Sequence, residues 1–90
     1  MSQALKSMIN AAQVRAARAL LNINQDDLAT IASVHVATIR RLEAATEVRG
    51  AVETLWKIQK ALEAAGVEFI PEEAGRGPGV RLKQSRDRRL

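Results

Sequence analysis

The chain has 90 residues, 47% of them hydrophobic and none of them cysteine, and a net charge of +4. This length allows one small domain with a single core, and the lack of cysteine excludes disulfides and thiol chemistry. No apolar run reaches the roughly 18 residues of a membrane span and no secretory leader begins the chain, so we expect a cytoplasmic protein. Basic residues gather near both ends around an acidic middle, which suits a polyanionic partner; the alternative is that these are ordinary solvated charges.

Apolar residues recur at helical spacing in four successive segments. The predicted helices run from Ser2 to about Asn22, from Gln25 to Ala32, from Val36 to Ala44 and from Val52 to Ala65. Asn24 is a good N-cap for the second of these helices. Asp26 and Asp27 follow it in the first helical turn, where carboxylates favour the positive end of the helix dipole, so we interpret them as helix-start residues and not as catalytic groups.

The fourth predicted helix has an apolar face that we expect to be buried. This face consists of Val52, Leu55, Trp56, Ile58 and Leu62, and the helix ends at Gly66. Because Trp56 lies beside Leu55, we interpret it as a core residue; the alternative is an anchor for a partner.

After Gly66 the apolar period changes from helical to alternating. Val67–Ile70 and Val80–Lys83 each read as a strand, and Pro71–Gly79 reads as the connecting turn of a β-hairpin. An isolated hairpin is only marginally stable, so this one must lie on the helices or pair with the hairpin of another chain. The basic tail, residues 85–90, holds Arg86, Arg88 and Arg89, which either contact nucleic acid or are inert.

Two short amphipathic helices separated by a tight break are the most informative part of the chain. They span Gln25 to Glu43, with the sequence QDDLATIASVHVATIRRLE and the break at Ser33-Val34-His35. Helices paired in this way allow the second one to enter the major groove of DNA while the first lies across its mouth. The spacing therefore predicts a helix-turn-helix that binds DNA.

The same residues resemble the Cro and phage-repressor (XRE-like) helix-turn-helix family. The resemblance covers about residues 10–66 and rests on Gln25-x-x-Leu28-Ala29-x-x-Ala32-x-Val34-x-x-x-Thr38-Ile39-x-Arg41-Leu42-Glu43, followed by Thr54-Leu55-x-x-Ile58-x-x-Ala61-Leu62. It implies a mainly α, lambda-repressor-like domain of four to five helices with a C-terminal β-hairpin. We expect residues 1–66 to be the DNA-binding domain, residues 67–84 the hairpin and possible dimerisation element, and residues 85–90 the tail.

The resemblance also implies roles for individual residues. Gln25, His35 and Thr38 occupy phosphate-contacting places, and helix starts suit phosphates for physical reasons as well. Val36, Ala37 and Arg41 occupy base-facing places with Arg40 beside them, and an arginine can pair bidentately with guanine.

Two further expectations concern the pose of the recognition helix. The resemblance implies that Arg18 and Glu43 form a structural ion pair, the alternative being two unpaired surface charges. Ser33 stands where the family turn often has glycine, and a non-glycine residue with positive φ costs roughly 1 kcal/mol there. Ala44 and Ala45 replace the polar or glycine residues that often follow the helix in the family.

The sequence therefore predicts a sequence-specific transcriptional regulator of double-stranded DNA that acts as a homodimer on an inverted repeat. The alternative is a protein-interaction module of the antitoxin or anti-activator type that uses the same face on a protein. His35 is the single histidine, so no metal site of His and Cys can form, and no catalytic set is visible. We expect no enzyme activity, no cofactor and no small-molecule ligand.

Overall fold

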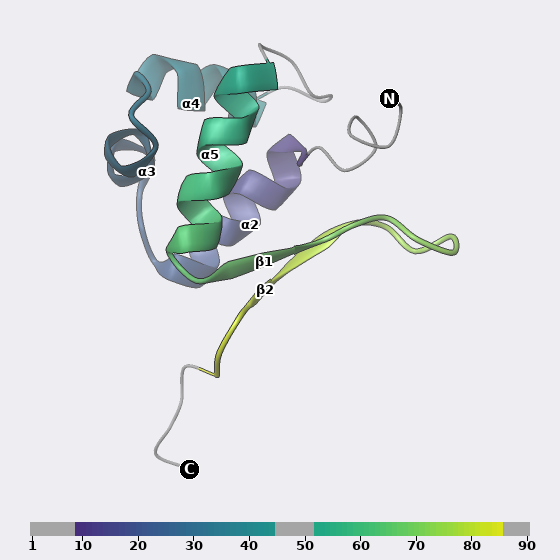
Figure 1. The fold of residues 1–90 in the computed structure, drawn as a ribbon. Helices are drawn as coiled ribbons and strands as arrows, with labels where there is room; N and C mark the ends of the chain where they lie inside the picture. The colour runs from purple at the N-terminus through teal and green to yellow at the C-terminus, as the bar shows by residue number, and fades with distance from the viewer. Residues whose placement is uncertain (1–8, 45–51, 86–90) are drawn as a thin grey trace.

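A computed structural model describes residues 9–44 and 52–85 of the protein, and within these ranges the fold is mainly helical with a C-terminal β-hairpin. This architecture confirms the fold class predicted from the sequence. The helices pack around a single core, and the hairpin crosses beneath α2 and α5 (Figure 1). The elements are α2 (Ala11–Leu21), α3 (Gln25–Ala32), α4 (Val36–Ala44), α5 (Val52–Ala64), β1 (Val67–Ile70) and β2 (Gly79–Leu82).

The first described helix begins later than the sequence pattern predicts. The prediction of one helix from Ser2 to Asn22 is wrong, because Ile9 and Asn10 are not helical and α2 begins at Ala11; residues 2–8 lie outside the described residues. The Asn10 side chain accepts a hydrogen bond from the Gln13 N–H at 2.8 Å, and the Gln13 side chain accepts one from the Asn10 N–H at 3.0 Å. This reciprocal capping box fixes the helix start.

Helices α3 and α4 lie at their predicted bounds, Gln25–Ala32 and Val36–Ala44. Asn24 caps α3 as expected: its side chain accepts from the Asp27 N–H at 2.7 Å, and the Asp27 carboxylate accepts from the Asn24 N–H. Between the helices Ser33 adopts a left-handed conformation with φ of 58°, while the Val34 N–H donates to the Ala29 carbonyl at 3.0 Å. This sharp turn sets the angle between the two helices.

The strain at Ser33 gives a stability prediction. Replacing Ser33 with glycine is expected to stabilise the domain by about 1 kcal/mol, since glycine adopts positive φ without a Cβ clash. Urea denaturation would measure the change. Ser33→Ala is the matched control, because alanine keeps the Cβ; if both variants were equally stable, the backbone at residue 33 would not be strained.

The core is aliphatic and draws on every described element except β2. Its buried members are Ile9, Val14, Ala17, Leu28, Ala29, Ala32, Ile39, Leu42, Leu55, Ile58, Leu62 and Val67. In α5 the prediction that Val52 and Trp56 are buried is wrong, because they are 58% and 52% exposed. Leu55, Ile58 and Leu62, at positions i, i+3 and i+7, form the buried face of α5. Val52 and Trp56 lie outside this face and are therefore exposed to solvent. Helix α5 also ends at Ala64, one residue before the predicted end.

The hairpin is fastened to the helices. Its strands pair antiparallel with Val67 opposite Leu82 and Ile70 opposite Gly79, so β2 begins and ends one residue earlier than predicted. Val67 is fully buried in the core. The buried Gln13 side chain donates from Nε2 to the Gly79 carbonyl at 2.9 Å and to the Ile70 carbonyl at 3.4 Å. The helices and the strands therefore share one core.

Candidate nucleic-acid interface

Helix α4 has one buried side and one exposed side. Ile39 and Leu42 are buried in the core, whereas Arg40 and Arg41 are exposed. Adjacent residues lie about 100° apart around a helix, so the two guanidinium groups extend in different directions along the exposed side. Within the described ranges no salt bridge joins either arginine to a carboxylate. Both guanidinium groups lie on the side of α4 that faces away from the core.

Four of the predicted site residues lie at the start of α4, whereas Gln25 lies at the start of α3. His35 directly precedes the helix and is exposed, and its carbonyl accepts the Thr38 N–H at 3.0 Å. Ala37 is exposed, whereas Thr38 is half-buried. Val36 is also partly buried and packs against the core, so it offers less surface than Ala37. This end of α4 presents one aromatic ring, one hydroxyl and small apolar groups.

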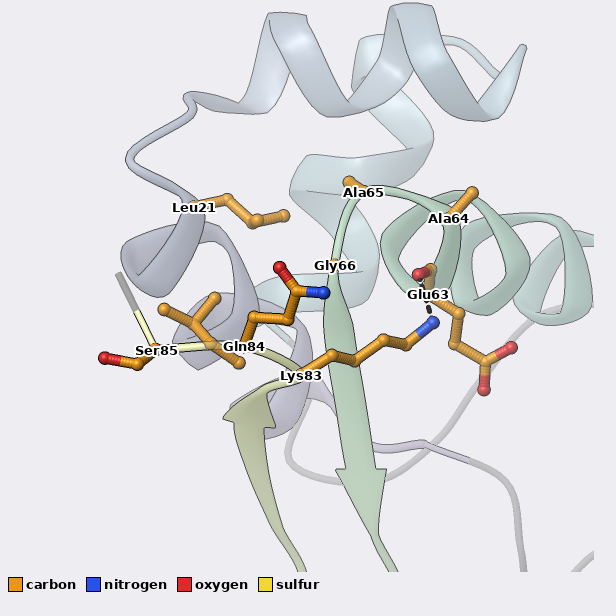
Figure 2. A pocket seen from close by; sticks show the side chains of 9 residues that line it. Leu21, Glu63, Ala64, Ala65, Gly66, Lys83, Gln84 and Ser85 are labelled. Carbon is orange, nitrogen blue, oxygen red and sulfur yellow. Dashed lines mark hydrogen bonds between the residues drawn. The ribbon is translucent and has the colours of Figure 1, made fainter. Parts of the chain in front are cut away.

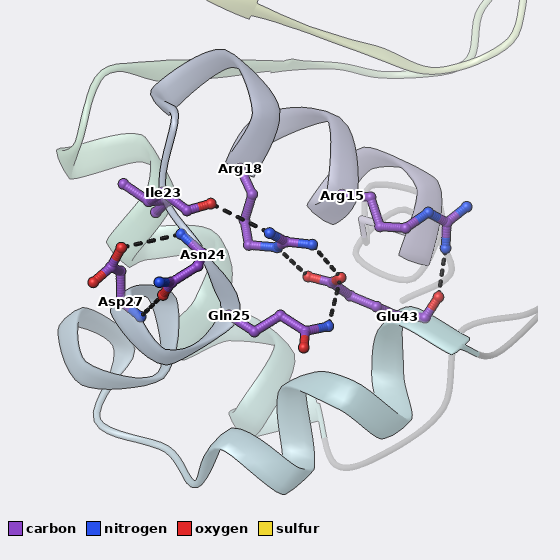
Figure 3. A network of polar contacts seen from close by, with 7 residues as sticks. All are labelled: Arg15, Arg18, Ile23, Asn24, Gln25, Asp27 and Glu43. Atoms are coloured by element: carbon purple, nitrogen blue, oxygen red, sulfur yellow. Dashed lines mark hydrogen bonds and ion pairs between the residues drawn. The ribbon is translucent and has the colours of Figure 1, made fainter.

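The other end of α4 is held by an ion pair to α2. Arg18 donates from Nε to Glu43 Oε2 at 2.7 Å and from Nη2 to Glu43 Oε1 at 2.8 Å, a bidentate arrangement (Figure 3). The Glu43 side chain is 4% exposed and that of Arg18 is 21% exposed. Arg18 also donates to the Ile23 carbonyl at 3.2 Å. Arg18 thereby connects the end of α4 to the segment that precedes α3.

Two further side chains complete this network around Glu43. Gln25, for which the sequence predicts a phosphate contact, donates from Nε2 to Glu43 Oε1 at 3.1 Å. Arg15 donates from Nη1 to the backbone carbonyl of Glu43, near the C-terminal end of α4 (Figure 3). The sequence reasoning missed this role of Arg15. The sequence feature that could have indicated this role is the spacing of three residues between Arg15 and Arg18, which puts both arginines on one side of α2.

The charge of Glu43 is stabilised by this network. Burial raises the pKa of the Glu43 carboxyl, but the hydrogen bonds from Arg18 and Gln25 and the charges of Arg18 and Arg15 outweigh burial, so the pKa is lowered overall. The hydrogen bonds to Glu43 raise the pKa of Arg18 in turn, against the opposing effect of its own burial. Both groups are therefore ionised at neutral pH, and the end of α4 is held by a charged pair.

An open pocket of about 370 Å³ lies between the ends of α2, α5 and β2 (Figure 2). Lys83 Nζ lies across it and donates to the Glu63 carbonyl at 2.7 Å, which satisfies a carbonyl at the end of α5. Among the described residues, no group of three or more His, Cys, Asp or Glu side chains could hold a metal ion. The pocket thus contains a lysine that caps the end of α5.

Several predicted features lie outside the described residues, namely Ala45 and the three arginines of the tail at 86–90. None of the described helices is both long enough and apolar enough to cross a membrane.

Comparison with known proteins identifies the region around this site. A family model described as helix-turn-helix matches residues 14–69, more than half of the chain, from within α2 to within β1. A search of curated proteins found no significant match. The matched range contains every residue of the α3–turn–α4 unit and both members of the Arg18–Glu43 pair.

Proposed function

Because the chain belongs to the XRE-type helix-turn-helix family of DNA-binding regulators, we propose that it binds an operator sequence-specifically by inserting α4 into the major groove of double-stranded DNA. One observation carries the proposal: α4 exposes Arg40 and Arg41 on one side while Arg18 holds its far end through Glu43. A recognition helix needs this combination of exposed polar side chains and a fixed pose.

The proposed contacts divide into phosphate and base contacts. His35, Thr38 and Gln25 contact phosphates near the helix starts. The Gln25 amide has two N–H groups, so the one that is not directed at Glu43 remains available to a phosphate oxygen. Arg41 reads a guanine, Arg40 supports it, and Ala37 and Val36 make apolar contacts, for which thymine methyl groups are suitable. With so few polar base contacts, the proposed specificity also depends on DNA shape.

We further propose that the protein acts as a homodimer. One recognition helix reads only a few base pairs, and two-fold pairing doubles the contacts. The hairpin of residues 67–84 is the proposed dimerisation element, because its two strands form a sheet of only two strands in the described part of the chain. The operator is then an inverted repeat with half-sites about one helical turn, roughly 34 Å, apart.

The salt dependence of binding tests this function. After selection of bound sequences from a random DNA pool, we expect affinity for the selected site to fall about a hundredfold between about 50 and 200 mM salt, for about four neutralised phosphates. A scrambled site of equal length should bind more weakly at both salt concentrations. If the protein instead acts as an interaction module on other proteins, DNA binding will be neither sequence-selective nor salt-dependent, and the regulator function will be excluded.

A further inference from the structure

The outer side of α5 exposes an apolar surface flanked by positive charge. Val52 and Trp56, one helical turn apart, are 58% and 52% exposed. The Lys60 ammonium lies over the Trp56 ring, 4.6 Å from its centroid, and Lys57 is exposed beside them. We call these four residues the α5 patch. An exposed tryptophan on a small domain costs solvation free energy and is the residue type most enriched in binding hot spots.

A second unusual surface is the hairpin tip, residues 71–78. Every residue of the tip is exposed, and it extends beyond the helices (Figure 1). It is an ordered turn, because Glu73 and Arg76 exchange backbone hydrogen bonds of 3.0 and 2.8 Å, and Ala74 and Gly75 adopt positive φ between them. A tip with fixed backbone geometry can present a defined surface to a partner.

We propose that the hairpin tip of one copy docks on the α5 patch of a second copy, and that the reciprocal contact forms at the same time. The tip cannot reach the patch of its own chain, because α5 leads directly into β1 and the tip lies at the opposite end of the hairpin (Figure 1). A two-fold axis forms the same contact twice, which closes a dimer.

Charge complementarity supports a second copy as the occupant. The tip carries two carboxylates, at Glu72 and Glu73, and the α5 patch carries two ammonium groups, at Lys57 and Lys60. The minority charges are also opposite in sign, because Arg76 belongs to the tip whereas two carboxylates border the patch: the exposed Glu53, and Glu63, whose Oε1 lies 3.8 Å from the Lys60 ammonium. The net negative tip therefore meets less like charge on the α5 patch than it would on a second tip.

The apolar parts of the two surfaces correspond as well. Pro71 and Pro78 lie at the two ends of the tip and are exposed. Their rings are rigid and apolar, so packing them on the Trp56 and Val52 side chains costs little conformational entropy. This inference rests on the proposed homodimer but not on DNA binding, so each can fail without the other.

Trp56 itself provides the readout, because it is the single tryptophan of the chain. When the concentration of the full-length protein is raised without DNA, the tryptophan emission should shift to shorter wavelength in step with a doubling of mass in sedimentation. Trp56→Ala should weaken the dimer about thirtyfold or more, as expected for a hot-spot residue. A dimer in which the emission of Trp56 does not shift, or a chain that stays monomeric at every concentration tested, would overturn the proposal.

Charge reversal gives the sharper test. Lys57→Glu/Lys60→Glu and Glu72→Lys/Glu73→Lys each place like charges in both contacts, so each variant alone should dimerise at least about tenfold more weakly than the parent chain. Mixed at equal concentrations, the two variants should form heterodimers, because each tip then meets a patch of opposite charge.

The same two variants distinguish the proposed contact from misfolding and from a dimer formed by the hairpins alone. Circular dichroism and urea midpoints near those of the parent chain establish that the variants fold. If the hairpins pair only with each other, Lys57→Glu/Lys60→Glu will dimerise normally and the proposal will be wrong. Neither variant changes a proposed DNA contact, so retained binding of a single half-site by the monomers would leave the proposed function intact.

Discussion

Replacing Arg18 with alanine is expected to destabilise the domain by about 2 to 3 kcal/mol, because the Glu43 carboxylate would remain buried without its bidentate partner. This is less than the roughly 3 to 5 kcal/mol usual for breaking a fully buried ion pair, since the Arg18 side chain is 21% exposed and part of its charge is already screened. Urea denaturation measures the loss. Operator affinity should fall with it, because α4 would lose the contact that fixes its end.

Two control variants distinguish the contribution of the ion pair to stability from that of neighbouring residues. Arg15→Ala removes an exposed arginine three residues away whose hydrogen bond within the described ranges goes to the Glu43 carbonyl and not to the carboxylate, so it should cost clearly less. Arg18→Met/Glu43→Leu removes both charges and should recover much of the stability, because no unpaired ion is left buried. Equal losses for Arg15→Ala and Arg18→Ala would contradict a specific role for the pair.

The same pair gives a pH dependence with a defined sign. The pKa of Glu43 is lower in the folded protein than its ordinary value. Its contribution to stability is therefore complete above the ordinary glutamate pKa of about 4.3 and is lost as pH falls through the lowered value. Urea midpoints between pH 6 and pH 3 should fall less steeply for Arg18→Met/Glu43→Leu than for the parent chain.

Replacing Arg41 with alanine is expected to weaken binding of the selected operator by about 5- to 150-fold, which corresponds to losing one bidentate guanine contact of about 1 to 3 kcal/mol. The side chain is exposed, so the urea midpoint should change little. A repeated selection from random DNA should show a relaxed preference at one base pair. An unchanged preference would mean that Arg41 acts only as a surface charge.

Arg41→Lys is the matched control for this experiment. Lysine keeps the positive charge but lacks the planar fork that pairs with guanine O6 and N7. The slope of affinity against salt should therefore stay close to that of the parent chain, while base preference relaxes as in Arg41→Ala. If Arg41→Lys retained the full base preference of the parent chain, a bidentate contact between Arg41 and guanine would be excluded.

The helix-turn-helix was predictable because its signals are local. Asn24 caps α3 through a residue three positions later, and the break at Ser33 interrupts an apolar pattern that resumes at Val36. The capping box of Asn10 and Gln13 is equally local, and that spacing in the sequence could have set the start of α2.

Other features needed more than residue type, and one of them depends on a contact that the sequence does not reveal. Trp56 is apolar, but apolar residues are also common on protein surfaces, so its residue type alone could not decide its burial. The narrower spacing of Leu55, Ile58 and Leu62 would have excluded it from the core stripe. Gln13 reaches the Gly79 carbonyl 66 residues away, and no local pattern predicts such a contact.

The position of that glutamine has a mechanical consequence. Helix α2 fastens the hairpin through Gln13 and fastens α4 through Arg18, so no flexible linker separates the proposed dimer contact from the proposed reading helix. The two recognition helices of the dimer would then lie at a fixed distance and orientation from each other. An extra base pair between half-sites would displace one of them by roughly 3.4 Å and rotate it by about 35°, and the DNA would have to deform to be read on both sides.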